Sequence, residues 1–351
     1  MLKKIGMYLV VGFLVSSAPS DAQWKTNLSF GSIYDSNADG VYTGEAERIT
    51  HMTLDVTRNG KNGRIYYTGD GFLFGQSGPR TFVANRMGMD MIYRLGGAKD
   101  RVVFGFAATN RLNRSVYNIY DYWGATGYLQ GKWYVQKDMM MKLGYQLDWR
   151  SYQNMDVSRY VDHNFSAQVS KFLPSRTTLQ ADAQFGYKLR DAAESQVVLG
   201  LQVAQSLTRN TGLSLRYQTR INTSAQQDVL SAILRSLTDE DILNSRYDYG
   251  GHRLTSKLTQ QLPAQTRLLI EGGYETRSYS DEFALDLDGN LLLGADLRKD
   301  QISFLDVDLE LPLTQKLTTV LGYGFLHLKS NDFYYNYGNR HSVSAHLDFG
   351  F

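Results

Sequence analysis

Apolar and polar residues alternate along most of the chain, in segments of about ten to fifteen residues. Residues 138–152 give the clearest example, because Met141, Leu143 and Tyr145 fall on one face and Lys142 falls on the other. A period of two places successive side chains on opposite faces of a β-strand. Each segment therefore predicts a strand with one apolar and one polar face, and we count about sixteen of them.

Tight turns and longer connections alternate along the chain between these segments. The run Arg58-Asn59-Gly60-Lys61-Asn62-Gly63 predicts a hairpin, because Asn-Gly supplies the positive φ that such turns need. Related turns recur at 172–177, 261–266 and 310–315, with a proline-free relative at 206–211. We place no proline inside a strand, because proline cannot donate to the hydrogen-bond ladder. The longer connections lie at about 153–158, 191–195, 223–246, 280–298 and 330–338.

The last thirteen residues, 339–351, show the same alternation and stop on an aromatic side chain. Val343, Leu347, Phe349 and Phe351 share the apolar face. This ending resembles the closing strand of bacterial outer-membrane β-barrels, which the barrel-assembly machinery reads as a signal. A soluble β-sandwich whose last strand ends in Phe is the alternative.

Composition narrows the fold class. The 351 residues contain no Cys and 24 Tyr, and the mean hydropathy is −0.35. That value excludes a helical membrane protein, which needs runs of about twenty apolar residues, but it allows a barrel with a polar lumen. We therefore expect an all-β protein: a transmembrane antiparallel up-and-down β-barrel, closed because an open sheet edge in lipid leaves backbone groups unpaired. The net charge of +2 gives no reason to expect nucleic-acid binding.

The first residues predict a targeting segment. Lys3 and Lys4 precede an apolar run from Ile5 to Val15, and small residues follow up to Ala22. This is the order of a secretory signal peptide, so we expect residues 1–22 to be cleaved. Residues 23–351 then form a single barrel domain. An even number of strands places both termini on the periplasmic side of an outer membrane.

The polar faces of the strands predict two charged walls in the lumen. Opposite charges on neighbouring walls would set a transverse field, as in the general-diffusion porins that the chain resembles. Interstrand ion pairing is the structural alternative, and the two are compatible. The basic wall comprises Lys188, Arg190, Arg216, Arg220, Arg253 and Lys257. The acidic wall comprises Glu271, Glu275, Asp306, Asp308, Glu310 and Asp348.

Two connections have features of their own. Residues 226–244 place Val229, Leu230, Ile233, Leu234 and Leu237 at helical spacing, which predicts a short amphipathic helix that constricts the mouth or caps the rim. Such a constriction would replace the long third outer loop of general porins, because the third outer connection here is short. Residues 283–297 predict a hairpin turning at 288–290. Its acidic residues invite a calcium interpretation, but an Asp-Gly-Asn turn is common for purely steric reasons, and no Glu follows at the twelfth position of an EF-hand loop, so we assign no metal site.

We find no sequence motif for catalysis and expect neither an enzyme nor a cofactor. The histidines are scattered: His163 and His252 fall on the lipid side, and His346 falls among small lumen residues. The leading hypothesis is a channel that lets small hydrophilic solutes diffuse through a charged, water-filled lumen. The alternatives are a polysaccharide export conduit with a periplasmic partner, and a plugged barrel that anchors an envelope complex. Expected partners are outer-membrane lipid and lipopolysaccharide, the barrel-assembly machinery, and a homo-oligomer or envelope protein.

Overall fold

A computed structural model describes the chain in ranges separated by short gaps. The predicted signal peptide, Arg190 and the predicted helix within 226–244, with its five apolar residues, all lie outside the described residues. The description covers residues 23–38, 40, 44–96, 99–155, 159–189, 193–222, 247, 249–291, 294 and 296–351.

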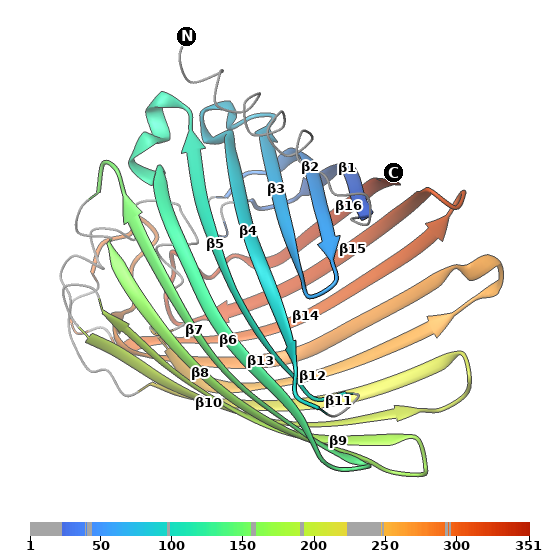
Figure 1. Cartoon of the computed structure of the whole chain (residues 1–351). Coiled ribbons are helices and arrows are strands. Elements are labelled where there is room, and N and C mark those ends of the chain that lie inside the picture. The colour runs from blue at the N-terminus through green and yellow to red at the C-terminus, as the bar shows by residue number, and fades with distance from the viewer. Residues whose placement is uncertain are drawn as a thin grey trace.

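Sixteen antiparallel strands form one closed barrel in which each strand pairs with its neighbours in the sequence (Figure 1). The strands are β1 (Gln23–Asp35), β2 (Glu47–Gly60), β3 (Gly63–Phe74), β4 (Phe82–Arg94), β5 (Arg101–Asn113), β6 (Tyr122–Gln136), β7 (Met139–Tyr152), β8 (Tyr160–Phe172), β9 (Thr177–Leu189), β10 (Ala193–Ser206), β11 (Thr211–Asn222), β12 (Tyr249–Gln261), β13 (Arg267–Phe283), β14 (Leu297–Pro312), β15 (Leu317–Ser330) and β16 (Gly338–Gly350).

The predicted all-β barrel and its count of sixteen strands are confirmed. One detail is wrong: Pro312 is the last residue of β14, although we expected no proline within a strand. Its position explains why it is tolerated. The pairing of β14 with β13 stops at Glu310, so Pro312 has a neighbouring strand on one side only. A proline at such an end interrupts no continuous ladder.

The barrel closes where β1 pairs with β16. Nine residue pairs join the two strands, from Asn27 with Gly350 to Asp35 with Ser342. At one end of this seam the Arg340 guanidinium donates to both carboxylate oxygens of Asp35, with its shortest contact at 2.6 Å from Nη2 to Oδ2. The predicted closing strand therefore does close the barrel.

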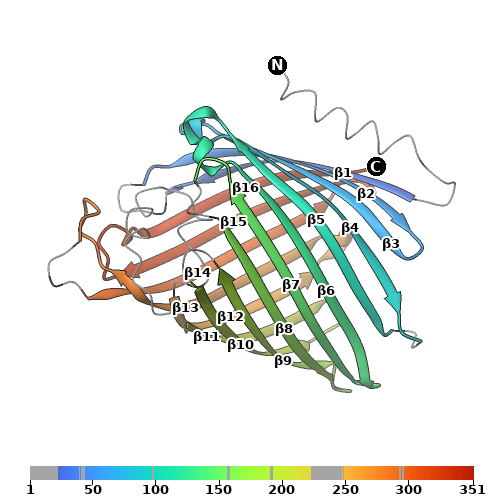
Figure 2. The same cartoon turned by 60° about the vertical axis from the view of Figure 1, so that its left-hand side comes forward.

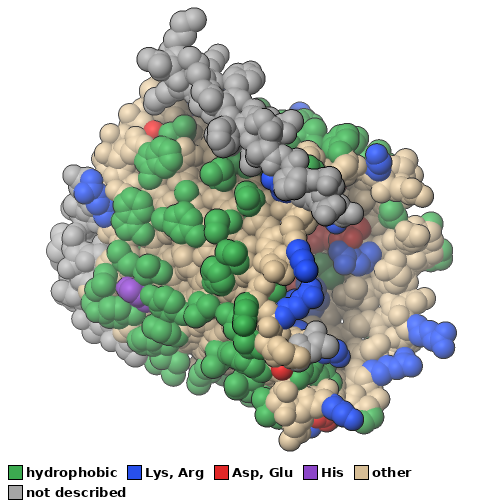
Figure 3. Space-filling model, in the orientation of Figure 1, with side chains coloured by type: hydrophobic (Ala, Val, Ile, Leu, Met, Phe, Trp, Pro, Cys, Tyr) green, Lys and Arg blue, Asp and Glu red, His purple; other side chains and the backbone are tan. Residues whose placement is uncertain are grey.

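The outer surface of the barrel is apolar. Phe104, Leu143, Leu201 and Val343 are between 43% and 62% exposed, and all lie on outward-facing strand positions. Figure 3 shows hydrophobic side chains covering one side of the outer wall, with charged side chains gathered around the hollow interior. The alternation seen in the sequence thus separates an apolar outside from a polar lumen. Among the described residues, no helix is long and apolar enough to cross a membrane.

Short turns gather at one end of the barrel and longer connections at the other (Figure 2). The short turns include the two-residue hairpin between β2 and β3 and the 3-10 turn η5 (Pro263–Gln265) between β12 and β13. The other end carries η2 (Gly78–Arg80), η3 (Ser115–Tyr120) and the hairpin within 284–296. As predicted, that hairpin turns at Gly289, whose φ is +81°.

One glycine allows β12 and β13 to lie close together. A Cβ on Gly251 would lie 1.8 Å from the Thr276 carbonyl oxygen. We therefore expect G251A to force the two backbones apart and to lower the free energy of unfolding by about 1–3 kcal/mol. Gly212 on β11 provides a control, because nothing lies within 4 Å of its added Cβ. Urea unfolding of the refolded barrel measures both variants, and equal losses would contradict the steric explanation.

Candidate functional site in the barrel lumen

The described members of the two predicted walls alternate along their strands with exposed apolar positions, so they lie on the inward face of the barrel. On β12 and β13 they face each other across the ladder rather than forming separate walls. Arg253 lies 3.6 Å from Glu275, and Lys257 lies 3.4 Å from Glu271. The direct pairing follows from the register, in which both pairs are Cα partners. The structural alternative, interstrand ion pairing, therefore describes this stretch of wall.

Two further members of the predicted basic wall, Arg216 and Lys188, are also paired with carboxylates. Arg216 Nη2 lies 2.9 Å from a carboxylate oxygen of Asp182, and Lys188 Nζ lies 3.7 Å from Glu194. The Arg220 guanidinium lies over the ring of Tyr249, 4.5 Å from its centroid. Asp182 and Glu194 were not among the predicted lumen residues, although they occupy inward positions on β9 and β10. With its acidic partners present, this wall is much less basic than expected.

The predicted acidic wall divides into paired and unpaired carboxylates. Glu310 forms an ion pair with Arg267, and Asp348 accepts a hydrogen bond from the Ser29 hydroxyl. Asp306 and Asp308 on β14 form no hydrogen bond or ion pair with any described residue. Because an unpaired ionised carboxylate is costly away from water, these two side chains need a solvated environment.

A row of four cations was missed by the sequence analysis. The register places Arg94 of β4 opposite Arg101 of β5, Arg101 opposite Lys132 of β6, and Lys132 opposite Lys142 of β7. No ion pair joins any of the four to a described carboxylate. We call these four residues the basic row. Like charges directly opposite one another in a sheet are destabilising unless water screens them.

The basic row and the unpaired carboxylates face each other across the lumen. In the closed order of sixteen strands, β13 lies eight strands from β5, and β14 lies eight strands from β6. Both groups lie in the half of the barrel that ends in short turns. A transverse separation of charge therefore exists, but its basic side comes from β4 to β7 rather than from β9 to β12.

A cavity of about 580 Å³ lies along the lumen wall and is lined by residues of β1–β4, β6 and β7. Its lining includes Asp55, Arg64, Arg86 and Tyr128. Arg64 and Tyr128 both bind the buried carboxylate of Asp90, which holds them against the wall. Arg86 is exposed in this cavity and forms no ion pair within the described chain. The cavity therefore presents a free guanidinium to any solute that occupies it.

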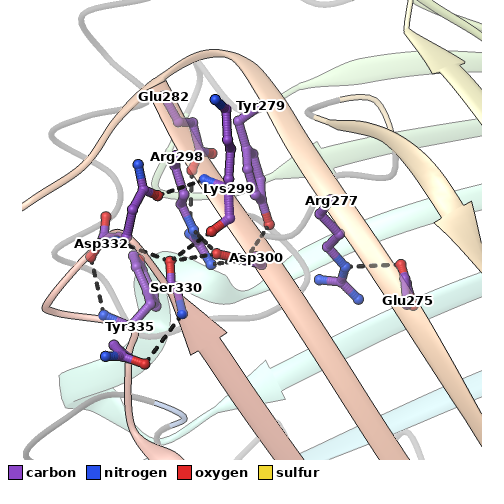
Figure 4. Close-up of polar contacts among 12 residues, drawn as sticks. Glu275, Arg277, Tyr279, Glu282, Arg298, Lys299, Asp300, Ser330, Asp332 and Tyr335 are labelled. Atoms are coloured by element: carbon purple, nitrogen blue, oxygen red, sulfur yellow. Dashed lines mark hydrogen bonds and ion pairs between the residues drawn. The ribbon is translucent and has the colours of Figure 1, made fainter. Parts of the chain in front are cut away.

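A cluster of buried charges fixes the barrel at the end that carries the longer connections (Figure 4). Arg298 of β14 contacts Asp300 at 2.7 Å and Glu282 at 3.3 Å. Its guanidinium carbon lies 3.9 Å from the ring centroid of Tyr335 and 4.5 Å from that of Tyr279. Arg298, Asp300 and Glu282 are all buried. The cluster ties β13 and β14 to the connection that follows β15.

The connection predicted at 330–338 is partly folded inward. Asp332 is fully buried, and its carboxylate accepts hydrogen bonds from the backbone N–H groups of Leu285 and Tyr335. In the neighbouring hairpin, Asp286 accepts bonds from the backbone N–H groups of Asp288 and Asn290. This is the steric turn that the sequence allowed. Among the described residues, no group of three or more His, Asp or Glu side chains is arranged to hold a metal ion.

These two loop carboxylates are expected to respond to pH in opposite directions. Burial raises the pKa of Asp332 above its ordinary value of 3.8. Hydrogen bonds, led by the one from the Asn290 backbone, lower the pKa of Asp286. Because its pKa is raised, Asp332 contributes stability that is lost as the pH rises above about 4. Because its pKa is lowered, Asp286 contributes stability that is lost as the pH falls below about 4.

Urea unfolding of D332N and D286N between pH 3 and 7 measures this difference. The advantage of the wild type over D332N should shrink as the pH rises from about 4. Its advantage over D286N should shrink as the pH falls below about 4. The same slope for both variants would contradict the assignment.

Comparison with known proteins supports the fold. No protein-family model and no curated protein matches the sequence. A structure described as a bacterial polysaccharide outer membrane secretin aligns with a TM-score of 0.55 and 10% identity, over 93% of this chain and 97% of its own. OccAB1 from Acinetobacter baumannii aligns with a TM-score of 0.52 and 8% identity, over 96% and 98%.

The outer membrane protein OpdK from Pseudomonas aeruginosa aligns with a TM-score of 0.52 and 9% identity, over 94% of this chain and 99% of its own. At such low identities the likeness concerns architecture alone. Because each alignment covers nearly the whole of both chains, it includes the complete barrel. The chain therefore has the fold of outer-membrane β-barrel porins.

Proposed function

We propose that the chain is an outer-membrane channel through which small hydrophilic solutes diffuse. The observation that carries this proposal is the set of unpaired charges on opposite walls of the lumen: the basic row on β4–β7, and Asp306 and Asp308 on β14. Unpaired charges inside a dry barrel would cost several kcal/mol each, so their presence favours water in the lumen. A closed barrel of sixteen strands is wide enough for an aqueous channel.

The proposal includes a location and an orientation. The apolar outer wall suits a lipid bilayer, and the even number of strands places both chain ends on the side of the short turns. That side would be periplasmic, and the longer connections would face outward. Insertion would require the barrel-assembly machinery, for which the outward residues of β16 would provide the signal. The mechanism is passive diffusion and involves neither catalysis nor a cofactor.

A conduit for an exported polysaccharide is the second candidate. Its support is the alignment with the polysaccharide secretin over nearly the whole of both chains. A conduit would need a periplasmic partner to deliver the polymer. The unpaired charges on opposite walls favour small polar solutes instead, since such a field orients dipoles rather than guiding a long neutral chain.

Conductance of the refolded chain in a planar lipid bilayer tests the proposal. The second protein to be measured is a chain that lacks residues 226–244, for which the sequence predicts an amphipathic helix. Steady conductance of the intact chain would support the channel. Conductance only after the deletion would favour the conduit, because the intact chain would then be closed. No conductance from either protein would contradict both and leave the anchoring role.

A further inference from the structure

Tyrosine and histidine side chains form hydrogen-bonded pairs on the outward face of the barrel. In each pair the histidine lies three residues after the first residue of its strand. The tyrosine lies on the preceding strand, two residues beyond the direct partner of the histidine and towards the short turns. The pairs are Tyr145 with His163 at 2.9 Å, Tyr217 with His252 at 2.8 Å, and Tyr323 with His341 at 3.0 Å.

A fourth pair has the same geometry but contains asparagine. Asn85 lies three residues after the first residue of β4, and the Tyr67 hydroxyl donates to its Oδ1 at 2.7 Å. The direct partner of Asn85 in the ladder is Gly69, so Tyr67 again lies two residues beyond that partner. The four pairs sit on β4, β8, β12 and β16, which is every fourth strand of sixteen. We call these four pairs the outer belt.

On β14, β15 and β16 the outer belt coincides with a boundary between polar and apolar side chains. Towards the short turns from His341, the outward positions include Leu305, Leu321 and Val343, which are 38–55% exposed. Towards the longer connections they become polar and basic. Tyrosine and other amphipathic rings gather where a membrane-spanning surface meets the head groups. The boundary therefore marks the level of the head groups on this side of the barrel.

On β14, β15 and β16 the outward positions on the polar side of this boundary carry cations and no carboxylates. Lys299 and Lys329 are exposed and form no ion pair with a described residue. The ring of His327 is hydrogen-bonded to Asn339 at 2.7 Å, two positions along the ladder from the pair Phe325 and His341. No outward-facing position of the three strands holds Asp or Glu. We name the basic sector for Lys299, His327, Lys329, Asn339 and His341.

We infer that the basic sector binds the phosphate groups of the glycolipid that forms the outer leaflet. The inference rests on the orientation given in the proposed function, which places this end of the barrel in that leaflet. Lysine ammonium groups and imidazole or amide N–H groups are suitable donors to phosphate. Because the side chains of the basic sector face the lipid, they contact lipid head groups as well as ions from solvent. The absence of carboxylates leaves the cations free for an anionic partner.

Native mass spectrometry of the full-length protein with purified bis-phosphorylated lipid A tests the site. We expect K299Q/K329Q to weaken binding about fivefold for each lysine removed, the usual effect of one basic residue near an anionic membrane surface. The matched control is K61Q/K316Q, which removes the same charge from two exposed turns at the opposite end. Heat-modifiable migration on a gel confirms that each variant is folded.

The remaining arms separate the possible ligands. Dephosphorylated lipid A should bind weakly to the wild type and to K299Q/K329Q alike. Phosphatidylglycerol should bind with little difference between the variants. An equal loss in K299Q/K329Q and K61Q/K316Q would overturn the site, and an equal effect with phosphatidylglycerol would overturn the glycolipid assignment. Conductance of K299Q/K329Q should match that of the wild type, so a failure of the channel proposal is recognised separately.

Discussion

Replacing Arg298 with methionine is expected to lower the free energy of unfolding by about 3–5 kcal/mol. Arg298 is only 7% exposed, and its partners Asp300 and Glu282 are 0% and 6% exposed. Methionine fills a similar volume but leaves two buried carboxylates without a cation. Two aromatic rings also lose their guanidinium neighbour. Guanidinium unfolding of the refolded barrel, followed by tryptophan fluorescence, measures the loss.

Two further variants separate charge from packing at this cluster. R267M removes an arginine that is 48% exposed and paired with Glu310, so it should cost no more than about 1 kcal/mol. R298M/E282Q/D300N removes the arginine together with its two ion-pair partners and should recover much of the stability that R298M loses. If R298M and R267M had the same effect, or if the triple variant were the least stable, the buried ion pairs would not be the cause.

Neutralising the two lumen walls separately should shift ion selectivity in opposite directions. D306N/D308N should lower the cation-to-anion permeability ratio about fivefold, and R94Q/R101Q/K132Q/K142Q should raise it by at least as much. A unit charge about 4 Å from a permeating ion in water contributes about 1 kcal/mol, which corresponds to that factor. The reversal potential under a tenfold potassium chloride gradient measures the ratio.

Salt and a remote charge provide the controls. At about 1 M salt the Debye length falls to roughly 3 Å, so both shifts should shrink. K61Q removes a charge from the turn between β2 and β3, outside the lumen, and should leave the ratio unchanged. Shifts of the same sign for the two wall variants, or a large shift for K61Q, would contradict the opposed-wall arrangement.

The strands could be predicted from the sequence because each one separates lipid from water. The outward face must be apolar and the inward face polar, so side-chain alternation alone locates residues such as Leu143 and Lys142. Strand ends also follow from turn chemistry, and the strand predicted at 138–152 is β7 (Met139–Tyr152) in the structure. The error at Pro312 arose because a proline at the last residue of a strand leaves no trace in the alternation.

The contacts within the lumen could not be predicted, because they depend on register. The alternation of inward and outward side chains places Arg253 and Glu275 in the lumen. Only the turn between β12 and β13 sets the register that makes them direct partners. The basic row depends on three successive registers, and its position opposite Asp306 depends on the closed count of sixteen strands. Each of these is a property of the closed barrel and not of a single segment.

The outer belt could not be predicted from the sequence either, because the spacing of its pairs along the chain varies. Tyr145 and His163 are 18 residues apart, whereas Tyr217 and His252 are 35 apart. The difference comes from the length of the connections, so no fixed spacing reveals the repeat. The sequence did place His163 and His252 on the lipid side, and the strand boundaries would then have shown their common offset.

The seam between β1 and β16 determines when the barrel can close during synthesis and delivery of the chain. Ser29 and Asp348 are 319 residues apart, and Asp35 and Arg340 are 305 apart. β1 is synthesised first, but it gains its second neighbouring strand only when β16, the last strand, has been made. During that interval β1 and the growing edge both present unpaired backbone groups, which readily pair with other chains. The protein must consequently be shielded throughout its delivery, and its final strand ends that vulnerable period.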